Sequence, residues 1–469
     1  MKREQFIKEV AGKMQNGLCD LFVGSGISAP SGLPTWSKFL DPYLSEIGIQ
    51  QREEDNLPLL AQYIVNRNVG NRNIIYEAVY NTFGKSYPLN AYHKVISNFP
   101  VHTLWTTNYD CLLEQALSDR VLRVVASEEG LLHPHGNTEV EIIKLHGCAR
   151  SATKGIVLTQ ADYDCFLDDK PKLSQRLREA LINRSLFFVG YSYHDPNIQA
   201  IMTQTYQMMG RITTNMHFIL LSEIVQRKDE SDESFEQRKV RFELWITELN
   251  RVGIRELIVP RSDIVSVLKA IEHKARGAAV FVTGGHKITG ETEEYAREIG
   301  VSLAEMQDVT LNNGQSEGIG NAVLSSFMKK VFENKQDVNK RVHIFPNPYS
   351  ISPAFSDDPS LIPELKRTRV PLVADSTLIV AFPGNMGTKA EIEVAREKER
   401  IVFPVLCDME DYSARSVVSL LEDSENMEIL KRIVPKYHGK LVKKELPTRI
   451  ETIEAMQEII NGEIQGKTK

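Results

Sequence analysis

The 469-residue sequence has no apolar run that approaches the ~20 residues needed to cross a bilayer. Its five cysteines form no C-x-x-C pair, so neither a disulfide framework nor a structural zinc site is indicated. The formal net charge of −6 offers no basic excess for binding nucleic acid. The pattern of the first residues predicts an amphipathic helix that contains acidic groups, and this pattern differs from that of a secretory signal peptide. We therefore expect a cytoplasmic protein that uses no metal, binds no nucleic acid and spans no membrane.

Hydrophobic residues make up 42% of the chain and charged residues 25%, as in globular proteins, and the length suits two or three domains. Short apolar strands that run into glycine-rich turns and then helices recur in both halves. This pattern predicts an α/β fold with two Rossmann-like parallel-sheet domains, covering residues 1–275 and 278–469. Residues 36–100 have the pattern of helices only, which predicts a helical insert over a cleft in the first domain.

The first glycine turn follows a strand predicted over residues 21–23. Gly24, Ser25 and Gly26 form the turn, and Ile27 and Ser28 are expected to open a helix. Glycines let a pyrophosphate approach the backbone, and a helix N-terminus offers it free N–H groups. The spacing is not the full G-x-G-x-x-G of dinucleotide-binding folds, so an ordinary strand-to-helix turn is the alternative.

Three later strands also end in polar residues. Asn108 and Asp110 follow the strand expected at 102–107, His146 follows the strand at 142–145, and residues 190–197 follow the strand at 185–189. In an open parallel sheet, ligands bind outside the carboxyl ends of the strands. We therefore expect these residues to form one site. A charged run at 226–241 is expected to form a solvated helical hairpin instead.

Taken in order, residues 24–28, 31–34, 106–110 and 144–147 resemble four motifs of the sirtuin family. That family has a GAG-x-S loop, an SG-(I/L)-P segment, a T-x-N-x-D motif and a catalytic histidine followed by glycine. The resemblance covers roughly residues 1–275 and implies a cleft that binds NAD. The segment GYSYHDPN that ends at Asn197 resembles one found in bacterial sirtuin-like proteins that consume NAD.

The resemblance implies that Asn108 and His146 are catalytic. Cleavage of the nicotinamide–ribose bond builds positive charge on the ribose, and an imidazole, with an ordinary pKa of ~6.5, suits the role of base toward a hydroxyl or water. Asn108 would hold the ribose hydroxyls or the water. The implied NAD-binding residues are Gly24, Ser25, Gly26, Ser28, Asp110, Gly190, Ser192, Asp195 and Asn197.

Each of these assignments has a structural alternative. Asn108 and Asp110 would also serve as a cap pair for the helix that follows them. His146 would also fit as a packed or capping residue at a strand end. For the segment that contains His194 and Asp195, two interpretations are equally supported: it lines the cleft, or it is an ordinary loop.

Two departures from the sirtuin deacetylases bear on the reaction. Thr35-Trp36-Ser37 stands where those enzymes have Asp-Phe-Arg, and their zinc-binding cysteines have no counterparts. The peptide-binding apparatus is therefore altered, while the residues of the cofactor cleft remain. The resemblance implies cleavage of NAD by water rather than protein deacetylation.

The second domain carries a different signature. Residues 383–391, together with Arg369 and Asp375, resemble the PGG-x-GT-x-x-E signature of the SLOG superfamily, with Asn385 in place of the second glycine. The resemblance covers about residues 278–465 and implies a nucleotide pocket, with Arg369 on a phosphate and Glu391 on ribose hydroxyls. Glu391 would alternatively be only a first-turn helix acid. The implied ligand-binding residues are Gly284, Gly285, Arg369, Gly384, Gly387, Thr388, Lys389 and Glu391.

The succession of the two domains resembles the effectors of the Thoeris bacterial anti-phage system. It implies that a TIR-domain partner makes a cyclic ADP-ribose-type signal, which binds the second domain of a homo-oligomer, expected to be a tetramer. The first domain would then deplete NAD. Two alternatives are an NAD-dependent protein deacylase and a non-catalytic sensor of NAD or another nucleotide.

Overall fold

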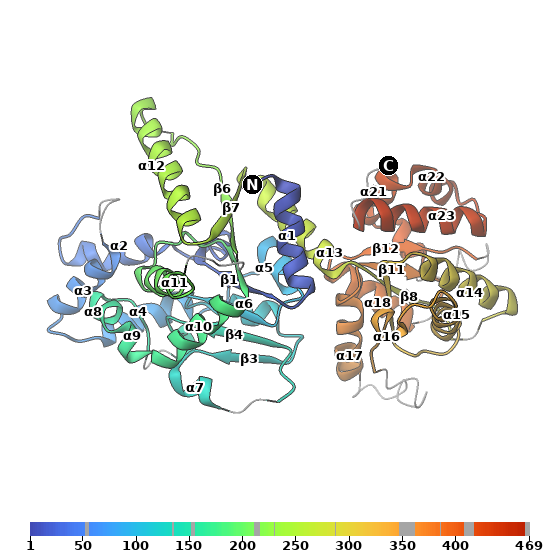
Figure 1. Ribbon diagram of the computed structural model, residues 1–469, viewed down its shortest axis with the longest axis horizontal. Coiled ribbons are helices and arrows are strands. Elements are labelled where there is room, and N and C mark those ends of the chain that lie inside the picture. Colours follow the sequence, from blue (N-terminus) through green and yellow to red (C-terminus); the bar gives the residue numbers. More distant parts are fainter. Residues whose placement is uncertain are drawn as a thin grey trace. The chain divides into compact units, whose positions relative to one another are not determined.

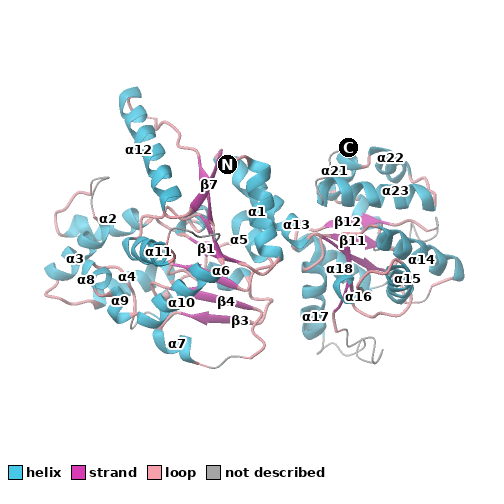
Figure 2. Ribbon diagram, viewed as in Figure 1, coloured by secondary structure: helices cyan, strands magenta, loops and turns pink. Residues whose placement is uncertain are grey.

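The computed structural model divides the chain into two compact units, Met1–Ile271 and Glu272–Lys469, and the division falls within helix α13 (Ile264–Arg276). The described residues are all except 52–55, 134–135, 152–154, 211–215, 229, 287, 347–361, 385, 408–416 and 465–469. Each unit is built around one parallel sheet flanked by helices (Figure 1, Figure 2), which confirms the α/β fold class. No helix among the described residues is long and apolar enough to cross a membrane.

The first sheet has seven strands in the order β3-β4-β2-β1-β5-β6-β7, and every neighbouring pair is parallel. The bounds are β1 (Cys19–Val23), β2 (Thr103–Thr106), β3 (Leu122–Val125), β4 (Val140–Lys144), β5 (Ser185–Val189), β6 (His217–Ser222) and β7 (Ile254–Val259). Strands β4, β2, β1 and β5 are buried along their whole length, so buried and exposed residues do not alternate along them. All carboxyl ends meet at one edge of the sheet.

Helices cover both faces of this sheet. The helices of the first unit are α1 (Arg3–Gln15), α2 (Trp36–Glu46), α3 (Leu57–Arg67), α4 (Asn73–Phe83), α5 (Ala91–Ser97), α6 (Leu112–Ala116), α7 (Glu128–Leu132), α8 (Gln160–Asp164), α9 (Phe166–Asp169), α10 (Pro171–Asn183), α11 (Pro196–Met208), α12 (Asp232–Arg251) and α13, which reaches the boundary. On β5, Phe187 packs against Phe6 of α1, with ring centroids 5.9 Å apart. The next residue, Phe188, points to the other face and shares a core with Leu177 of α10 and Ile201 of α11.

Helices α2, α3 and α4 form the helical insert expected between the first two strands. They enclose a hydrophobic cluster of their own, which also takes in Leu158 from the segment after β4. Thr35 starts α2 as its cap, since its side chain accepts a hydrogen bond from the Lys38 N–H. The insert is therefore a small helical layer with its own core.

Two segments of the first unit differ from the expected structure. No α-helix follows the first glycine turn: Ser25–Ile27 and Ala29–Ser31 are separate 3-10 turns. Pro30 lacks a backbone donor and Gly32, with φ 96°, ends the second turn in the left-handed region. The charged run at 226–241 is not a hairpin, because no glycine or proline interrupts it after Asp232 and it continues as the single helix α12.

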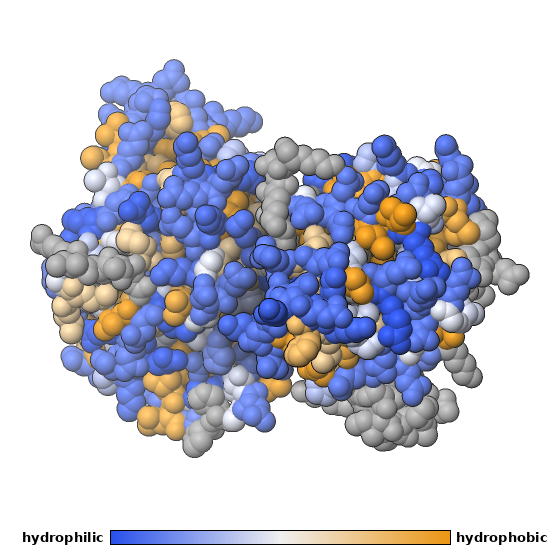
Figure 3. Space-filling model, turned by 45° about the vertical axis from the view of Figure 1, so that its right-hand side comes forward, coloured by the Kyte–Doolittle hydropathy of each residue, from blue (hydrophilic) through white to orange (hydrophobic). Residues whose placement is uncertain are grey.

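Helix α12 projects from the body of the first unit (Figure 1). Leu249 is the one fully buried side chain of this twenty-residue helix, while Val240 and Leu244 are exposed. The face drawn in Figure 3 is mainly hydrophilic, and its hydrophobic groups are scattered, including on this projecting helix. Helix α12 is therefore exposed to water over most of its length, where it carries charged side chains.

The second sheet has five parallel strands in the order β10-β9-β8-β11-β12. They are β8 (Ala278–Thr283), β9 (Val309–Asn313), β10 (Val342–Ile344), β11 (Leu378–Ala381) and β12 (Ile401–Pro404). The helices are α14 (Gly290–Glu305), α15 (Ile319–Glu333), α16 (Val338–Arg341), α17 (Ile362–Ala374), α18 (Met386–Glu397), α20 (Val418–Leu421), α21 (Ser424–Ile433), α22 (Pro435–Lys443) and α23 (Arg449–Ile459). The strand order changes direction between β8 and β11, which is where open sheets of this kind bind ligands.

Candidate functional site

The turn after β2 fixes Asn108 against the loop after β1. The Thr106 hydroxyl donates to the Val23 carbonyl at 2.8 Å and accepts from the Asn108 N–H at 2.9 Å. This turn directs the buried Asn108 side chain so that its Nδ2 lies 3.3 Å from the Ser28 hydroxyl. Two residues predicted from separate motifs are therefore in direct contact.

His146 and Asp195 meet above the same edge of the sheet. His146 follows β4 and Asp195 follows β5, and β2 and β1 lie between these strands. The two loops nevertheless converge, so that His146 Nε2 lies 3.0 Å from Asp195 Oδ2. The pair consequently spans the ends of β2 and β1, the strands that are followed by Asn108 and Ser28.

Both oxygen atoms of the Asp195 carboxylate have partners. Its Oδ1 accepts from the backbone N–H groups of Asn197 and Ile198, at 3.0 and 3.1 Å, and so caps α11. Burial alone raises the pKa of Asp195, but the facing His146 and these two N–H groups outweigh burial and hold it below its usual value. The carboxylate is therefore charged near neutral pH and able to orient an imidazole and stabilise its protonated form.

Around this pair the structure leaves buried polar atoms without partners. Within the described residues, the Tyr191 hydroxyl and Asn197 Nδ2 are buried and make no hydrogen bond. Such groups are rare in folded proteins unless a water or ligand satisfies them. Their position beside Asp195 fits a polar substrate with several hydroxyl groups, such as the ribose side of NAD.

The glycines of the first turn allow two loops to touch. The N–H groups of Gly24 and Gly26 donate to the carbonyls of Val189 and Gly190, at 3.0 and 2.8 Å. A Cβ on Gly24 would lie 2.4 Å from the Gly190 oxygen, and Gly190 itself has φ 62°. These backbone donors are thus occupied within the protein, whereas the sequence pattern predicted that they would be free for a pyrophosphate. Ser25, Gly26 and Ser192 are exposed at this edge.

Asp110 and Lys144 organise the other side of the Asn108 turn. Asp110 Oδ1 accepts from the Leu112 N–H at 3.0 Å, which matches the alternative capping role at the start of α6. The buried Lys144 Nζ donates to the carbonyls of Tyr109 and Asp110 and to Glu114 Oε1, the last at 2.8 Å. Lys144 therefore holds the turn in place from β4, a role that its position inside an apolar strand did not reveal.

Lys170 stabilises the segment that carries His146. Its Nζ donates to the carbonyls of Leu145 and Gly155, both at 2.8 Å. Burial lowers the pKa of Lys170 to about 8. Gly147, with φ 84°, completes the turn, since a Cβ there would lie 2.8 Å from the Gly155 carbonyl oxygen.

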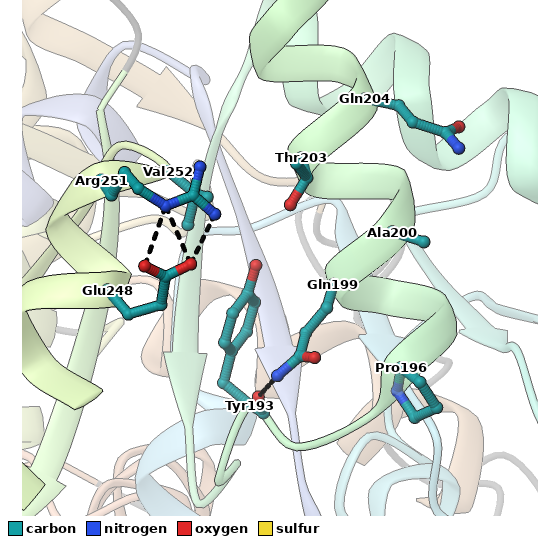
Figure 4. Close-up of a pocket in the computed structure, with 9 residues that line it drawn as sticks. All are labelled: Tyr193, Pro196, Gln199, Ala200, Thr203, Gln204, Glu248, Arg251 and Val252. Carbon is teal, nitrogen blue, oxygen red and sulfur yellow. Dashed lines mark hydrogen bonds and ion pairs between the residues drawn. The ribbon is translucent and has the colours of Figure 1, made fainter. Parts of the chain in front are cut away.

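The pocket drawn in Figure 4 lies on the α11 and α12 side of the Asp195 loop. Its volume is about 430 Å³, and it is lined by Tyr193, Gln199, Thr203, Glu248 and Arg251 among others. Arg251 is paired there with Glu248, and Gln199 donates to the Tyr193 carbonyl at 2.7 Å. Neither Asn108 nor His146 lines it. His194, left open by the sequence, is exposed and stacks on Trp245 of α12.

In the second unit, a buried polar cluster lies at the point where the strand order changes. The Thr283 hydroxyl at the end of β8 donates to Glu391 of α18. Arg369 of α17 faces the same carboxylate, with Nε 3.6 Å from Oε1. The sequence pointed to Arg369 and Glu391, whereas Thr283 was missed because it looks like the last residue of an apolar strand.

Electrostatics and close packing shape this second cluster. Burial raises the pKa of Glu391, and the Arg369 charge and the Thr283 hydroxyl counter that rise only in part. A Cβ on Gly384 would lie 2.2 Å from the Thr388 hydroxyl, and one on Gly284 2.7 Å from Ile319. The Gly384 turn is therefore packed closely against the start of α18 and the Gly284 turn against the start of α15, with Lys389 exposed. Asn385 lies outside the described residues.

The chain is similar in sequence to several known proteins. A family model described as "SIR2-like domain" matches residues 102–243, which include Asn108, His146 and Asp195. NAD(+) hydrolase ThsA of Bacillus cereus (strain MSX-D12) is 28% identical over 344 residues, 72% of each chain. The chain resembles ThsA. The ThsA of Enterococcus faecium is 26% identical over 86% of this chain and 88% of its own.

Two weaker similarities complete the comparison. Defense-associated sirtuin 2 of Bacillus subtilis is 27% identical over 42% of this chain and 20% of its own length. The solved structure of DNA processing protein A from Helicobacter pylori aligns with 36% of this chain and 81% of its own at 11% identity, with a TM-score of 0.25. That score is too low to indicate a shared fold.

Proposed function

We propose that the chain is an NAD⁺ hydrolase, which converts NAD⁺ and water to ADP-ribose and nicotinamide. The observation that carries the proposal is the His146–Asp195 pair, which spans the strand ends where Asn108 contacts Ser28. The SIR2-like match over residues 102–243, which include Asn108, His146 and Asp195, and the name NAD(+) hydrolase shared by the ThsA relatives support it. NAD is the substrate, and no step requires a metal.

The residues divide the chemistry between them. Nicotinamide leaves as a neutral ring, so the developing positive charge is on the ribose and no strong general acid is needed. His146 takes a proton from a ribose hydroxyl or from the attacking water, and the Asp195 carboxylate orients the imidazole and stabilises it once protonated. Asn108, fixed by Ser28 and the Thr106 turn, holds the ribose hydroxyls or the water.

Protein deacylation is the second candidate, and the first unit offers less for it. Thr35 is used as the cap of α2, and Trp36 stacks on Tyr163 at a centroid distance of 6.0 Å. These residues occupy the place of the Asp-Phe-Arg segment of sirtuin deacetylases. Trp36 is thus part of the packing between the helical insert and the body of the unit, where the deacetylases have a charged segment.

The second unit is proposed to be a SLOG-like sensor that controls the first. A cyclic ADP-ribose-type signal from a TIR-domain partner would bind at Arg369 and Glu391, with phosphate on the guanidinium and ribose hydroxyls on the carboxylate. Binding would shift the equilibrium of a homo-oligomer, a tetramer by resemblance, toward the state that hydrolyses NAD. The biological outcome would be NAD depletion in anti-phage defence.

One experiment separates the candidate functions. The purified full chain is incubated with NAD⁺, with and without a cyclic ADP-ribose isomer and an acylated peptide, and nicotinamide is measured. A hydrolase releases nicotinamide without the peptide, a deacylase needs it, and a sensor binds NAD without releasing nicotinamide. Release that depends strictly on the acylated peptide would overturn the proposal.

A further inference from the structure

Two cysteines directly follow the two catalytic motifs. Cys111 comes immediately after Asp110, and Cys148 comes two residues after His146. Their Sγ atoms lie 3.6 Å apart, and both are free thiols. The turns that carry Asn108 and His146 therefore each end in a sulfur atom, and these atoms are in contact.

The backbone already holds these two turns together. They follow β2 and β4, which are neighbours in the sheet, and Thr106 pairs with Lys144 at their ends. Beyond the strands, the Ala149 N–H donates to the Tyr109 carbonyl at 2.9 Å. The sulfur atoms are consequently fixed near each other by the fold, so little chain entropy opposes a bond between them.

The surroundings stabilise a thiolate at one of the two sulfurs. The pKa of Cys148 is lowered to about 5, first by the hydrogen bond with Cys111 and then by the Lys144 ammonium and the Arg150 N–H, against the effect of burial. The same hydrogen bond raises the pKa of Cys111, which keeps its proton. The pair is thus one thiolate and one thiol that share a hydrogen bond, and Cys111 is partly exposed.

A metal ion fits this cluster less well. Cys111, Cys148 and Glu114 offer ligand atoms within 4.8 Å of one another. However, Lys144 Nζ already binds Glu114 Oε1 at 2.8 Å and is a buried positive charge in the same cluster. A divalent cation would have to displace that ammonium group, whereas a thiolate is stabilised by it.

We propose that Cys111 and Cys148 form a reversible redox pair, which a hydroperoxide oxidises to a disulfide that joins the Asn108 turn to the His146 turn. The Cys148 thiolate attacks a peroxide oxygen, the O–O bond breaks, and the products are a sulfenic acid and, after protonation, water or an alcohol. The Cys111 sulfur then attacks the sulfenic sulfur, and a second water leaves. The balance is two thiols and H₂O₂ to one disulfide and two waters.

The disulfide would act on the site through the turns. A disulfide bond is about 2.05 Å long, so the sulfurs must approach by about 1.5 Å. The turns that hold Asn108 and His146 move with them, and a shift of this order lowers the rate of a reaction that depends on their positions. This consequence rests on the proposed NAD hydrolysis, whereas formation of the bond does not.

The test detects formation of the Cys111–Cys148 disulfide directly, starting from the reduced full chain. Hydrogen peroxide is added, free thiols are alkylated, and peptides are mapped by mass spectrometry without reduction. We expect a Cys111–Cys148 cross-linked peptide that dithiothreitol removes, at peroxide concentrations that leave most of the exposed Cys165 free. Its rate of formation should change less than twofold between pH 6.5 and 8, whereas an ordinary thiol with a pKa of ~8.5 speeds up by more than tenfold.

Two variants and a metal analysis complete the test. Cys111→Ser should leave Cys148 as a sulfenic acid that dimedone traps, while Cys165→Ser should still form the cross-link. Nicotinamide release by the oxidised wild type should fall and recover with dithiothreitol. The proposal is overturned if Cys111 and Cys148 stay reduced while Cys165 is oxidised, or if the purified chain holds a stoichiometric zinc ion that Cys111→Ser removes. A cross-link without any NAD hydrolysis would instead count against the proposed function.

Discussion

His146 Nε2 and Asp195 Oδ2 lie 3.0 Å apart although their strands, β4 and β5, are separated in the sheet by β2 and β1. The loops after β4 and β5 therefore bridge the strand ends that carry Asn108 and Ser28. This contact turns an isolated histidine into a histidine–carboxylate pair. The predictions below follow from that arrangement and from the cluster in the second unit.

Asp195→Asn should lower nicotinamide release by about 10²-fold, because the neutral amide no longer stabilises a protonated His146. The asparagine oxygen can still accept from the backbone of α11, so the cap is retained. Steady-state kinetics should show the loss in kcat rather than in KM. His194→Asn, an exposed neighbour in the same loop, is the control and should keep the wild-type rate. An unchanged kcat for Asp195→Asn would mean that Asp195 only caps α11.

Ser28→Ala should weaken the placement of Asn108, since its Nδ2 loses a partner at 3.3 Å. A neutral hydrogen bond contributes about 1 kcal/mol, so we expect a decrease in kcat/KM of roughly fivefold. Ser97→Ala removes another buried serine hydroxyl, one that donates to the Lys94 carbonyl, and serves as the matched control. Equal effects of the two substitutions would show that Ser28 has no specific role in positioning Asn108.

Arg369→Ala should abolish binding of a cyclic ADP-ribose isomer to the full chain, because Glu391 would be left buried without the facing guanidinium and the ligand without its phosphate partner. Isothermal titration calorimetry measures the binding, and nicotinamide release measures the triggered activity. NAD binding in the first unit should persist. Arg297→Ala, an exposed arginine of α14, is the control. Undiminished signal binding by Arg369→Ala would place the signal site elsewhere.

Acid should destabilise the first unit through His217. Burial lowers the pKa of His217 to about 4, and its Nδ1 accepts from the Leu186 N–H at 3.0 Å. Because the unfolded chain, with a pKa of ~6.5, binds the proton first as pH falls, stability is lost from about pH 6.5 down to 4, by roughly 3 kcal/mol. Urea unfolding of His217→Gln should show a smaller decrease over this range than the wild type or the exposed control His194→Gln. Parallel pH profiles would contradict this assignment.

The sequence revealed those parts of the site that depend on local pattern. Buried parallel strands produce apolar runs, and the polar residues after them, Asn108 and His146, must reach the same edge of a sheet. The two parallel sheets and the helical insert were predictable for the same reason. In the second unit, Glu391 was predictable from the local signature at the start of a helix, and Arg369 from the resemblance that this signature carries.

The remaining features depend on contacts between residues far apart in the sequence, which a local sequence pattern does not reveal. The Asp-Pro pair at Asp195 indicates a helix cap, but the His146 contact requires two loops to cross over two strands. Lys144 lies inside an apolar strand pattern that gives no sign of its role, yet its Nζ is buried against the backbone of the Asn108 turn. The first glycine turn was expected to open a helix, and only the packing of Gly190 against it explains why its glycines are needed.

Nicotinamide release by the signal-activated full chain tests the central claim most directly. Asn108→Ala and His146→Ala are compared with the wild type at saturating NAD⁺, and far-ultraviolet circular dichroism confirms that each variant is folded. The account predicts that each substitution lowers the rate by at least ~10²-fold. A folded Asn108→Ala or His146→Ala variant that releases nicotinamide at the wild-type rate would contradict it.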